Sequence, residues 1–302
     1  MSRSGKRTHQ RQLAKMARKR QQQRAAELRR QRTKVGLAAG TAALLVVAVG
    51  GVLLLKPAAK SSAKPSTAPT VSPSLAPGTQ TGTVTMQGTP PKTVACGASL
   101  PPAAGKPKPQ FSSPPAQTIN PANTYTAIVA TSCGTIEIKL DPVGTPVATN
   151  NFVFLAGKHF YDGIWFQRIV KGFMIQGGDP LGTGSGGPGY KFDTELNRTI
   201  KFGGQPGVLA YANSGINTNG SQFFVTVAPQ SFLDTSGPYT AFGTVTKGMN
   251  VLLKIAGLPA RTATTGCASP TEACRTDQAV YIDSITIKVT KPKPSASPTP
   301  SP

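Results

Sequence analysis

The sequence predicts a mainly β domain, a barrel or sandwich with helical caps, in the C-terminal part of a chain of 302 residues. Short runs rich in β-branched residues recur through residues 122–290, and glycine-rich turns separate them. Two helix signatures stand far apart within the same range. About 170 residues are enough for one hydrophobic core. We therefore expect a single folded domain over residues 122–290.

The elements of this domain follow from hydrophobic alternation and turn residues. Alternating residues at Tyr125–Thr131 and Thr135–Leu140 predict a hairpin. A helix follows, with Thr145 as its N-cap, Pro146 as its first residue and Gly157 at its end. The remaining elements are five strand-like runs, a second helix and a last alternating strand: Ile164–Val170, Phe173–Gln176, Val208–Ala212, Phe223–Ala228, Ala241–Thr246, Met249–Ala256 and Ile282–Val289.

Residues 35–55 predict a single membrane-spanning anchor. This segment has no charged residue, and about 20 apolar residues suffice to cross a bilayer. Residues 1–34, with thirteen Lys and Arg and one acid, form a basic arm that should stay in the cytoplasm, so the folded domain lies outside it. A cleaved secretory signal is the alternative, but Lys56-Pro57 directly after the segment is a poor cleavage context.

The rest of the chain predicts disorder. Residues 56–121 are rich in Pro, Ser, Thr and Ala and read as a disordered linker, and residues 291–302 as a similar tail. The net charge of +22 lies mostly in these ends, because residues 122–290 carry twelve basic and ten acidic residues. Nucleic acid is therefore not an expected partner, and we expect a monomer.

The chain has four cysteines, an even number that favours disulfides on the exported side of a membrane. Three pairings are possible. The short loop between Cys267 and Cys274 favours that pair, which leaves Cys96 to bond Cys133. A zinc site is the alternative, but no Cys-x-x-Cys spacing is present.

Three sequence stretches carry a family resemblance. They are FQRIVKGFMIQGGDP (166–180), YANSGINTNGSQFFVT (211–226), and FLD (232–234) followed by AFGTVTKGMNV (241–251). They resemble the cyclophilin-type peptidyl-prolyl cis-trans isomerases over about residues 122–290, in a membrane-anchored bacterial, actinobacterial-like form. The resemblance implies a closed eight-stranded antiparallel β-barrel capped by two α-helices.

The same resemblance implies the site residues. Arg168, Gln176 and Asn213 take the catalytic positions. The implied substrate-binding residues are Phe173, Met174, Gly184, Ala212, Ser214, Gln222, Phe224, Phe232, Leu233 and Tyr239. Three of these depart from the best-known family pattern: Phe232 stands where Trp is common, Tyr239 where His is common, and Ser214 where Ala is usual. Gln167 is a fourth departure, since His often precedes the Arg. Neither a metal nor a cofactor is implied.

The chemistry of X-Pro rotation suits such a site. The barrier of about 18–20 kcal/mol belongs to rotation about a partial double bond, so no nucleophile is needed. A guanidinium aimed at the prolyl nitrogen stabilises the twisted amide more than either planar form. The expected function is therefore isomerisation of proline-containing segments in exported proteins, with Arg168 as the donor. The alternatives are a non-catalytic proline-peptide-binding module and an envelope interaction protein.

Overall fold

The computed structural model of the chain describes residues 76–197, 199–262 and 272–292. All of them belong to one compact unit, residues 72–302. The predicted arm (1–34), anchor (35–55) and first part of the linker lie outside the described residues, as does the tail from residue 293. In the parts that are described, no helix has both the length and the apolar character that a membrane span requires.

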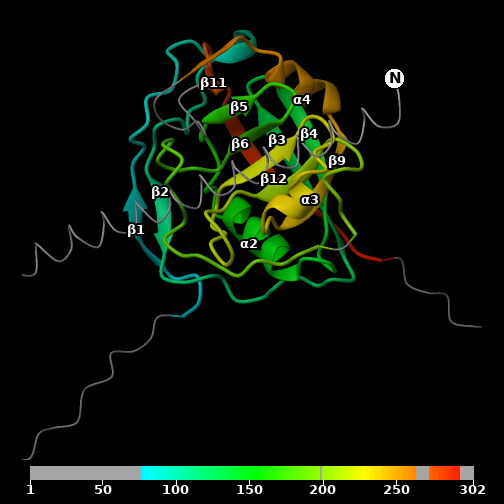
Figure 1. Ribbon diagram of the computed structural model, residues 1–302. Helices are drawn as coiled ribbons and strands as arrows, with labels where there is room; N and C mark the ends of the chain where they lie inside the picture. Colours follow the sequence, from blue (N-terminus) through cyan, green and yellow to red (C-terminus); the bar gives the residue numbers. More distant parts are fainter. Residues whose placement is uncertain (1–75, 198, 263–271, 293–302) are drawn as a thin grey trace, which may run out of the picture. The chain divides into compact units, whose positions relative to one another are not determined.

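An eight-stranded antiparallel sheet forms the centre of the domain (Figure 1). Its spatial order is β12-β3-β4-β9-β7-β8-β6-β5. The strands, in chain order, are β3 (Thr124–Thr131), β4 (Gly134–Leu140), β5 (Arg168–Val170), β6 (Met174–Gly177), β7 (Val208–Tyr211), β8 (Phe223–Thr226), β9 (Ala241–Lys247) and β12 (Ile282–Thr290). A separate two-stranded sheet pairs β10 (Ala260–Thr262) with β11 (Ala273–Thr276).

The sheet is curled, and its two edge strands approach each other just before β5 and β12. Trp165 and Tyr281 form an antiparallel bridge. The backbone N–H of Phe166 donates to Val280 at 2.9 Å, and that of Ile282 donates to Ile164 at 2.8 Å. The predicted strand number and antiparallel direction are therefore confirmed.

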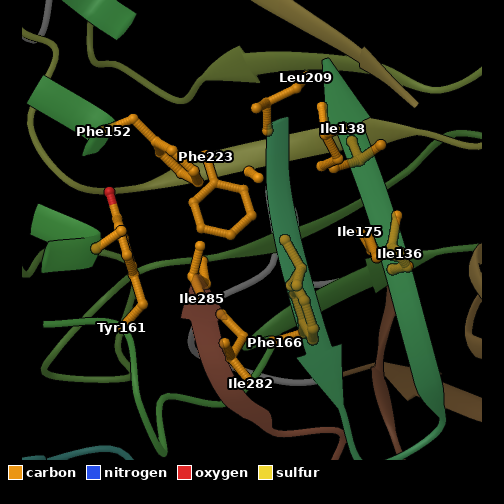
Figure 2. Close-up of a cluster of buried hydrophobic side chains, with 14 of the residues drawn as sticks. Ile136, Ile138, Phe152, Tyr161, Phe166, Ile175, Leu209, Phe223, Ile282 and Ile285 are labelled. Atoms are coloured by element: carbon orange, nitrogen blue, oxygen red, sulfur yellow. The ribbon is translucent and has the colours of Figure 1, made fainter. Parts of the chain in front are cut away.

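The core lies on one face of the strands because their side chains alternate. In β4, Ile136, Ile138 and Leu140 are buried, while Thr135 and Lys139 face solvent. These isoleucines belong to a cluster that also includes Phe152, which comes from the helix at Pro146–Gly157 (Figure 2). There the ring of Phe152 lies 5.6 Å from that of Phe223, edge to face.

The helices are α2 (Pro146–Gly157), the short α3 (Leu233–Ser236) and α4 (Met249–Ala256). The predicted bounds of α2 and α4 are confirmed. Thr145 is the N-cap residue, as predicted, but it makes no side-chain capping hydrogen bond, because its hydroxyl donates to the carbonyl of Asp141 at 3.0 Å. Instead, the Glu195 carboxylate accepts from the N–H groups of Val147 (3.1 Å) and Ala148 (2.8 Å). A carboxylate also suits the positive end of a helix dipole.

The linker prediction for residues 56–121 is corrected from residue 76 onward. Strand β1 (Gln80–Val84) pairs with β2 (Lys108–Phe111), and a 3-10 turn, η1, spans Ala95–Gly97. Figure 1 shows this hairpin beside the sheet. Phe111 and Ile119 are 2% and 8% exposed and belong to the main core. We name residues 76–121 the N-terminal extension. Its few apolar residues reach the core even though its composition is typical of disorder.

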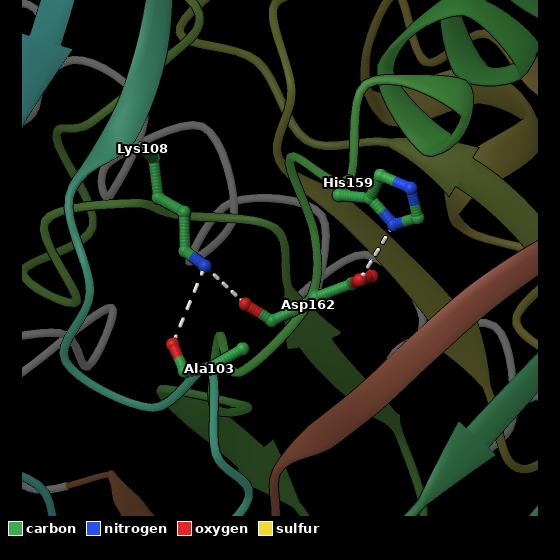
Figure 3. Close-up of polar contacts among 4 residues, drawn as sticks. All are labelled: Ala103, Lys108, His159 and Asp162. Atoms are coloured by element: carbon green, nitrogen blue, oxygen red, sulfur yellow. Dashed lines mark hydrogen bonds and ion pairs between the residues drawn. The ribbon is translucent and has the colours of Figure 1, made fainter.

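Two further contacts attach the N-terminal extension to the rest of the domain. Cys96 is bonded to Cys133 in the turn between β3 and β4, with Cα atoms 5.2 Å apart, which confirms that predicted pairing. The buried Lys108 ammonium donates to the backbone carbonyls of Asp162 and Ala103 (Figure 3). Cys274 is also disulfide-bonded; its predicted partner, Cys267, lies outside the described residues.

Candidate active site

A cavity of about 140 Å³ opens beside strands β5, β6 and β8. Nine of the thirteen predicted site residues line it: Arg168, Phe173, Met174, Gln176, Ala212, Asn213, Phe224, Leu233 and Tyr239. They come from four separate stretches of the sequence, which the antiparallel order of β5, β6, β8 and β7 brings together. We name this space the proline cavity, because its lining residues are among those that the family resemblance implied for catalysis and for binding a proline-containing substrate.

Strand alternation explains why these strands serve both the proline cavity and the core. In β6, Met174 and Gln176 line the cavity, while Ile175 between them belongs to the main core. In β8, Phe224 lines the cavity, and its neighbours Phe223 and Val225 point into the core. Residues two apart in a strand, such as Met174 and Gln176, therefore share the cavity face.

The apolar wall of the proline cavity has little freedom to move. Met174, Phe224 and Leu233 are at most 5% exposed and form one small cluster. Phe202, which the sequence analysis did not single out, stacks on Phe224 with ring centroids 6.0 Å apart. The ring of Tyr239 meets Phe224 edge to face at 5.6 Å. A close-packed wall of this kind excludes water from a ring placed against it.

Arg168 is the charged group of the proline cavity, and its guanidinium is held from several sides. Its Nε donates to Oε2 of Glu272 at 2.9 Å, and its Nη2 to Oε1 of the same carboxylate at 2.6 Å. Its Nη1 donates to Oε1 of Gln176 at 3.4 Å. The guanidinium carbon lies 5.8 Å from the centroid of the Phe173 ring. Glu272 was not a predicted site residue.

A second, larger groove of about 730 Å³ adjoins the proline cavity and shares Gln176, Ala212 and Asn213 with it. The predicted residues Gly184, Ser214 and Gln222 line this groove and not the proline cavity. The amide of Gln222 accepts from Gln176 at 3.0 Å and donates to the carbonyls of Gly184 and Gly186, at 2.9 Å each. Hydrogen bonds therefore connect Arg168, through two glutamines, to the glycine-rich loop.

Phe232 is the predicted residue that lines neither space. Its side chain is 52% exposed, and its ring centroid lies 5.6 Å from that of Phe173, which does line the proline cavity. Phe232 therefore stands at the rim. The larger groove also includes Val84 and Gln110 of the N-terminal extension, which the sequence analysis had assigned to the linker. Within the described ranges, His, Cys, Asp and Glu side chains form no group of three or more that could hold a metal ion.

Comparison with known families agrees with this arrangement. The family model described as cyclophilin type peptidyl-prolyl cis-trans isomerase/CLD matches residues 126–286, which is more than half of the chain. The chain belongs to the cyclophilin family. It is therefore a peptidyl-prolyl cis-trans isomerase, as the sequence analysis predicted. The N-terminal extension lies outside the matched range.

Curated cyclophilins show the same likeness. Peptidyl-prolyl cis-trans isomerase-like 1 of Neurospora crassa is 48% identical over 134 residues, covering 43% of this chain and 80% of the relative. The mouse protein of that name is 46% identical over 144 residues, covering 47% and 83%. A mouse protein with a peptidylprolyl isomerase domain and WD repeats is 49% identical over 135 residues. The match covers 44% of this chain but only 20% of that longer protein.

Among solved structures, a cyclophilin of Cryptosporidium parvum aligns with 56% of this chain and 99% of its own, at 30% identity and a TM-score of 0.49. These relatives come from eukaryotes. The membrane-anchored bacterial form that the sequence suggested stays a prediction.

Proposed function

We propose that this cyclophilin accelerates X-Pro rotation by placing the proline ring in the proline cavity and donating a hydrogen bond from Arg168 to the prolyl nitrogen. The observation that carries the proposal is the position of Arg168, which lines the same 140 Å³ cavity as Phe173, Met174 and Phe224, while its Nη1 donates to Gln176 of that cavity. In the twisted amide the nitrogen gains a basic lone pair that neither planar form has. A fixed cation at that point stabilises the transition state selectively.

The charge of Arg168 suits this role at any working pH, since a guanidinium is not deprotonated in proteins. Its side chain is 15% exposed, so a donor there competes little with water. Gln176 and Asn213 lie where the proline cavity meets the larger groove. We assign to these two residues the grip on the peptide that flanks the proline.

The substrates that we propose are proline-containing segments of exported proteins, met outside the cytoplasm beyond the single-pass membrane anchor at residues 35–55. The uncharged segment with its basic flank supports this placement. The Cys96–Cys133 bond also supports it, because structural disulfides persist mainly in oxidising compartments.

Arg168→Ala tests the mechanism. We expect kcat/KM for a proline tetrapeptide to fall about 10²–10³-fold, the usual cost of removing one donor to a transition state. Arg261→Ala is a matched control, because that arginine is 69% exposed and pairs with Asp277 away from the cavity. Its turnover should equal that of the wild type. Wild-type protein that binds the peptide without turning it over would instead favour the binding module.

A further inference from the structure

Glu272 is the immediate partner of Arg168, yet it lies outside the site as sequence motifs define it. It precedes β11, which pairs with β10 and not with the eight-stranded sheet. Its two carboxylate oxygens accept from Nε and Nη2 of Arg168 at 2.9 and 2.6 Å, a two-point contact. The Glu272 and Arg168 side chains are 18% and 15% exposed, so the pair is largely shielded from water.

The geometry leaves the cavity side of the guanidinium available. An arginine has five N–H donors in a rigid plane. Glu272 takes one on Nε and one on Nη2, and Gln176 takes one on Nη1. One donor therefore remains on each terminal nitrogen. Gln176 lines the proline cavity, whereas Glu272 is not among the residues that line it.

Arg168 has little else to fix its orientation. Its contact with Gln176 is long, at 3.4 Å, and the Phe173 ring at 5.8 Å restrains direction only weakly. A long, flexible side chain loses rotamer entropy when it is ordered, and a site in which that ordering precedes substrate binding turns over faster. A two-point carboxylate contact fixes both the position and the plane of a guanidinium.

We propose that Glu272 is a positioning residue for prolyl isomerisation, which orients the Arg168 guanidinium so that its free N–H donors face the proline cavity. This inference rests on the proposed role of Arg168. The carboxylate also offsets part of the positive charge. Orientation outweighs that loss in this proposal, because Glu272 and Gln176 together engage three of the five donors and leave one on each terminal nitrogen. A loss of turnover when Glu272 is removed therefore supports the positioning role, whereas an unchanged or raised turnover contradicts it.

The test is Glu272→Ala in the full chain, with Glu272→Gln as the milder variant that keeps one acceptor. We expect kcat for a proline tetrapeptide to fall about tenfold in Glu272→Ala, with KM changed less than about threefold, and an intermediate loss in Glu272→Gln. Asp277→Ala is the matched control, since it removes the carboxylate that pairs with Arg261 on the same β10–β11 hairpin. Its kcat should stay at the wild-type value.

Double mutants separate this inference from the function on which it rests. If Glu272 acts through Arg168, then Arg168→Ala with Glu272→Ala should turn over no more slowly than Arg168→Ala alone. A further loss in the double mutant, or an unchanged or raised kcat in Glu272→Ala, overturns the positioning role while Arg168 keeps its own. If Arg168→Ala keeps full turnover, the proposed mechanism itself fails. Urea unfolding of each variant shows whether a loss of kcat reflects unfolding. If Glu272→Ala is unfolded, the kcat of Glu272→Gln tests the positioning role in its place.

Discussion

The proline cavity and the N-terminal extension are held by different kinds of contact. Much of the wall of the proline cavity comes from the neighbouring strands β5, β6 and β8, whose backbone hydrogen bonds hold Arg168, Met174, Gln176 and Phe224 in place. The N-terminal extension lies outside that sheet and is attached by a disulfide, a buried lysine and a few apolar side chains. The cavity should therefore survive single changes that loosen the extension, whereas the extension depends on each anchor.

Removal of the N-terminal extension should have the largest effect. Burial of a large apolar side chain contributes about 1.5–3 kcal/mol, and Phe111 and Ile119 are both in the core. Together with the disulfide, the loss should exceed about 5 kcal/mol, comparable with the whole stability of many domains. We expect residues 122–302 to be largely unfolded in urea titrations where residues 76–302 are folded.

The truncated chain should also carry Cys133→Ser, so that a free thiol does not cause mispairing. Stabilities of the two chains within about 2 kcal/mol would contradict this expectation. In that case residues 122–302 would fold without the N-terminal extension, and the contrast between the extension and the cavity would not hold.

The contrast also explains what the sequence could predict. The helix at Met249–Ala256 agrees with its prediction at both ends, and strands β3, β4 and β7 agree within a residue or so, because hydrophobic alternation and turn residues are local. Strand β5 is shorter than predicted, because only Arg168–Val170 pair with β6. Trp165, just before β5, instead forms a bridge with Tyr281, just before β12. That bridge joins residues far apart in the chain and has no local signal.

In the site, the motifs predicted all nine residues that line the proline cavity, and Gly184, Ser214 and Gln222 of the larger groove, because these residues lie in or beside the stretches that carry the family resemblance. They did not predict Glu272, whose contact with Arg168 joins residues 104 positions apart. They also missed Phe111 and Ile119, which stand singly among Pro, Ser and Thr and show no periodicity. Composition averages over a segment, whereas a few isolated anchors decide whether it folds.

Loss of the Cys96–Cys133 bond should have an intermediate effect. The bond closes a loop with a sequence separation of 37, which in the chain-entropy model corresponds to about 4 kcal/mol. We expect the Cys96→Ser, Cys133→Ser double variant to lose about 2–4 kcal/mol in urea unfolding. Its kcat/KM should stay close to the wild-type value, because neither cysteine lines the proline cavity.

A matched comparison strengthens this experiment. Ser112→Ala changes an exposed serine of the N-terminal extension without removing a covalent bond, and it shows how much of the loss is local. If the double cysteine variant loses less than about 1 kcal/mol, packing holds the extension and the covalent bond adds little. If turnover also falls, the anchors and the cavity are coupled, and the two regions are less independent than their contacts suggest.

Lys108 should have the smallest effect, and a pH dependence reveals it. Its ammonium is buried against the carbonyls of Asp162 and Ala103, whereas the Asp162 carboxylate pairs with His159 at 2.9 Å (Figure 3). Desolvation by burial lowers the pKa of Lys108 below its usual 10.5. Lys108→Met keeps the length of the side chain and removes both the charge and the two hydrogen bonds. These effects oppose each other, so the stability at pH 7 should change by about 1 kcal/mol or less.

The sign of the pH dependence follows from the lowered pKa. Between the folded-state pKa and 10.5, the unfolded chain binds more protons at Lys108 than the folded chain does, so this residue's contribution to stability rises with pH and levels off above 10.5. The free energy of unfolding of the wild type, measured in urea, should therefore rise relative to that of Lys108→Met as the pH approaches 10.5. Tyrosine ionisation is common to both proteins and cancels in that difference. A flat difference would mean that water reaches the Lys108 ammonium, and this anchor would then be no more buried than a surface charge.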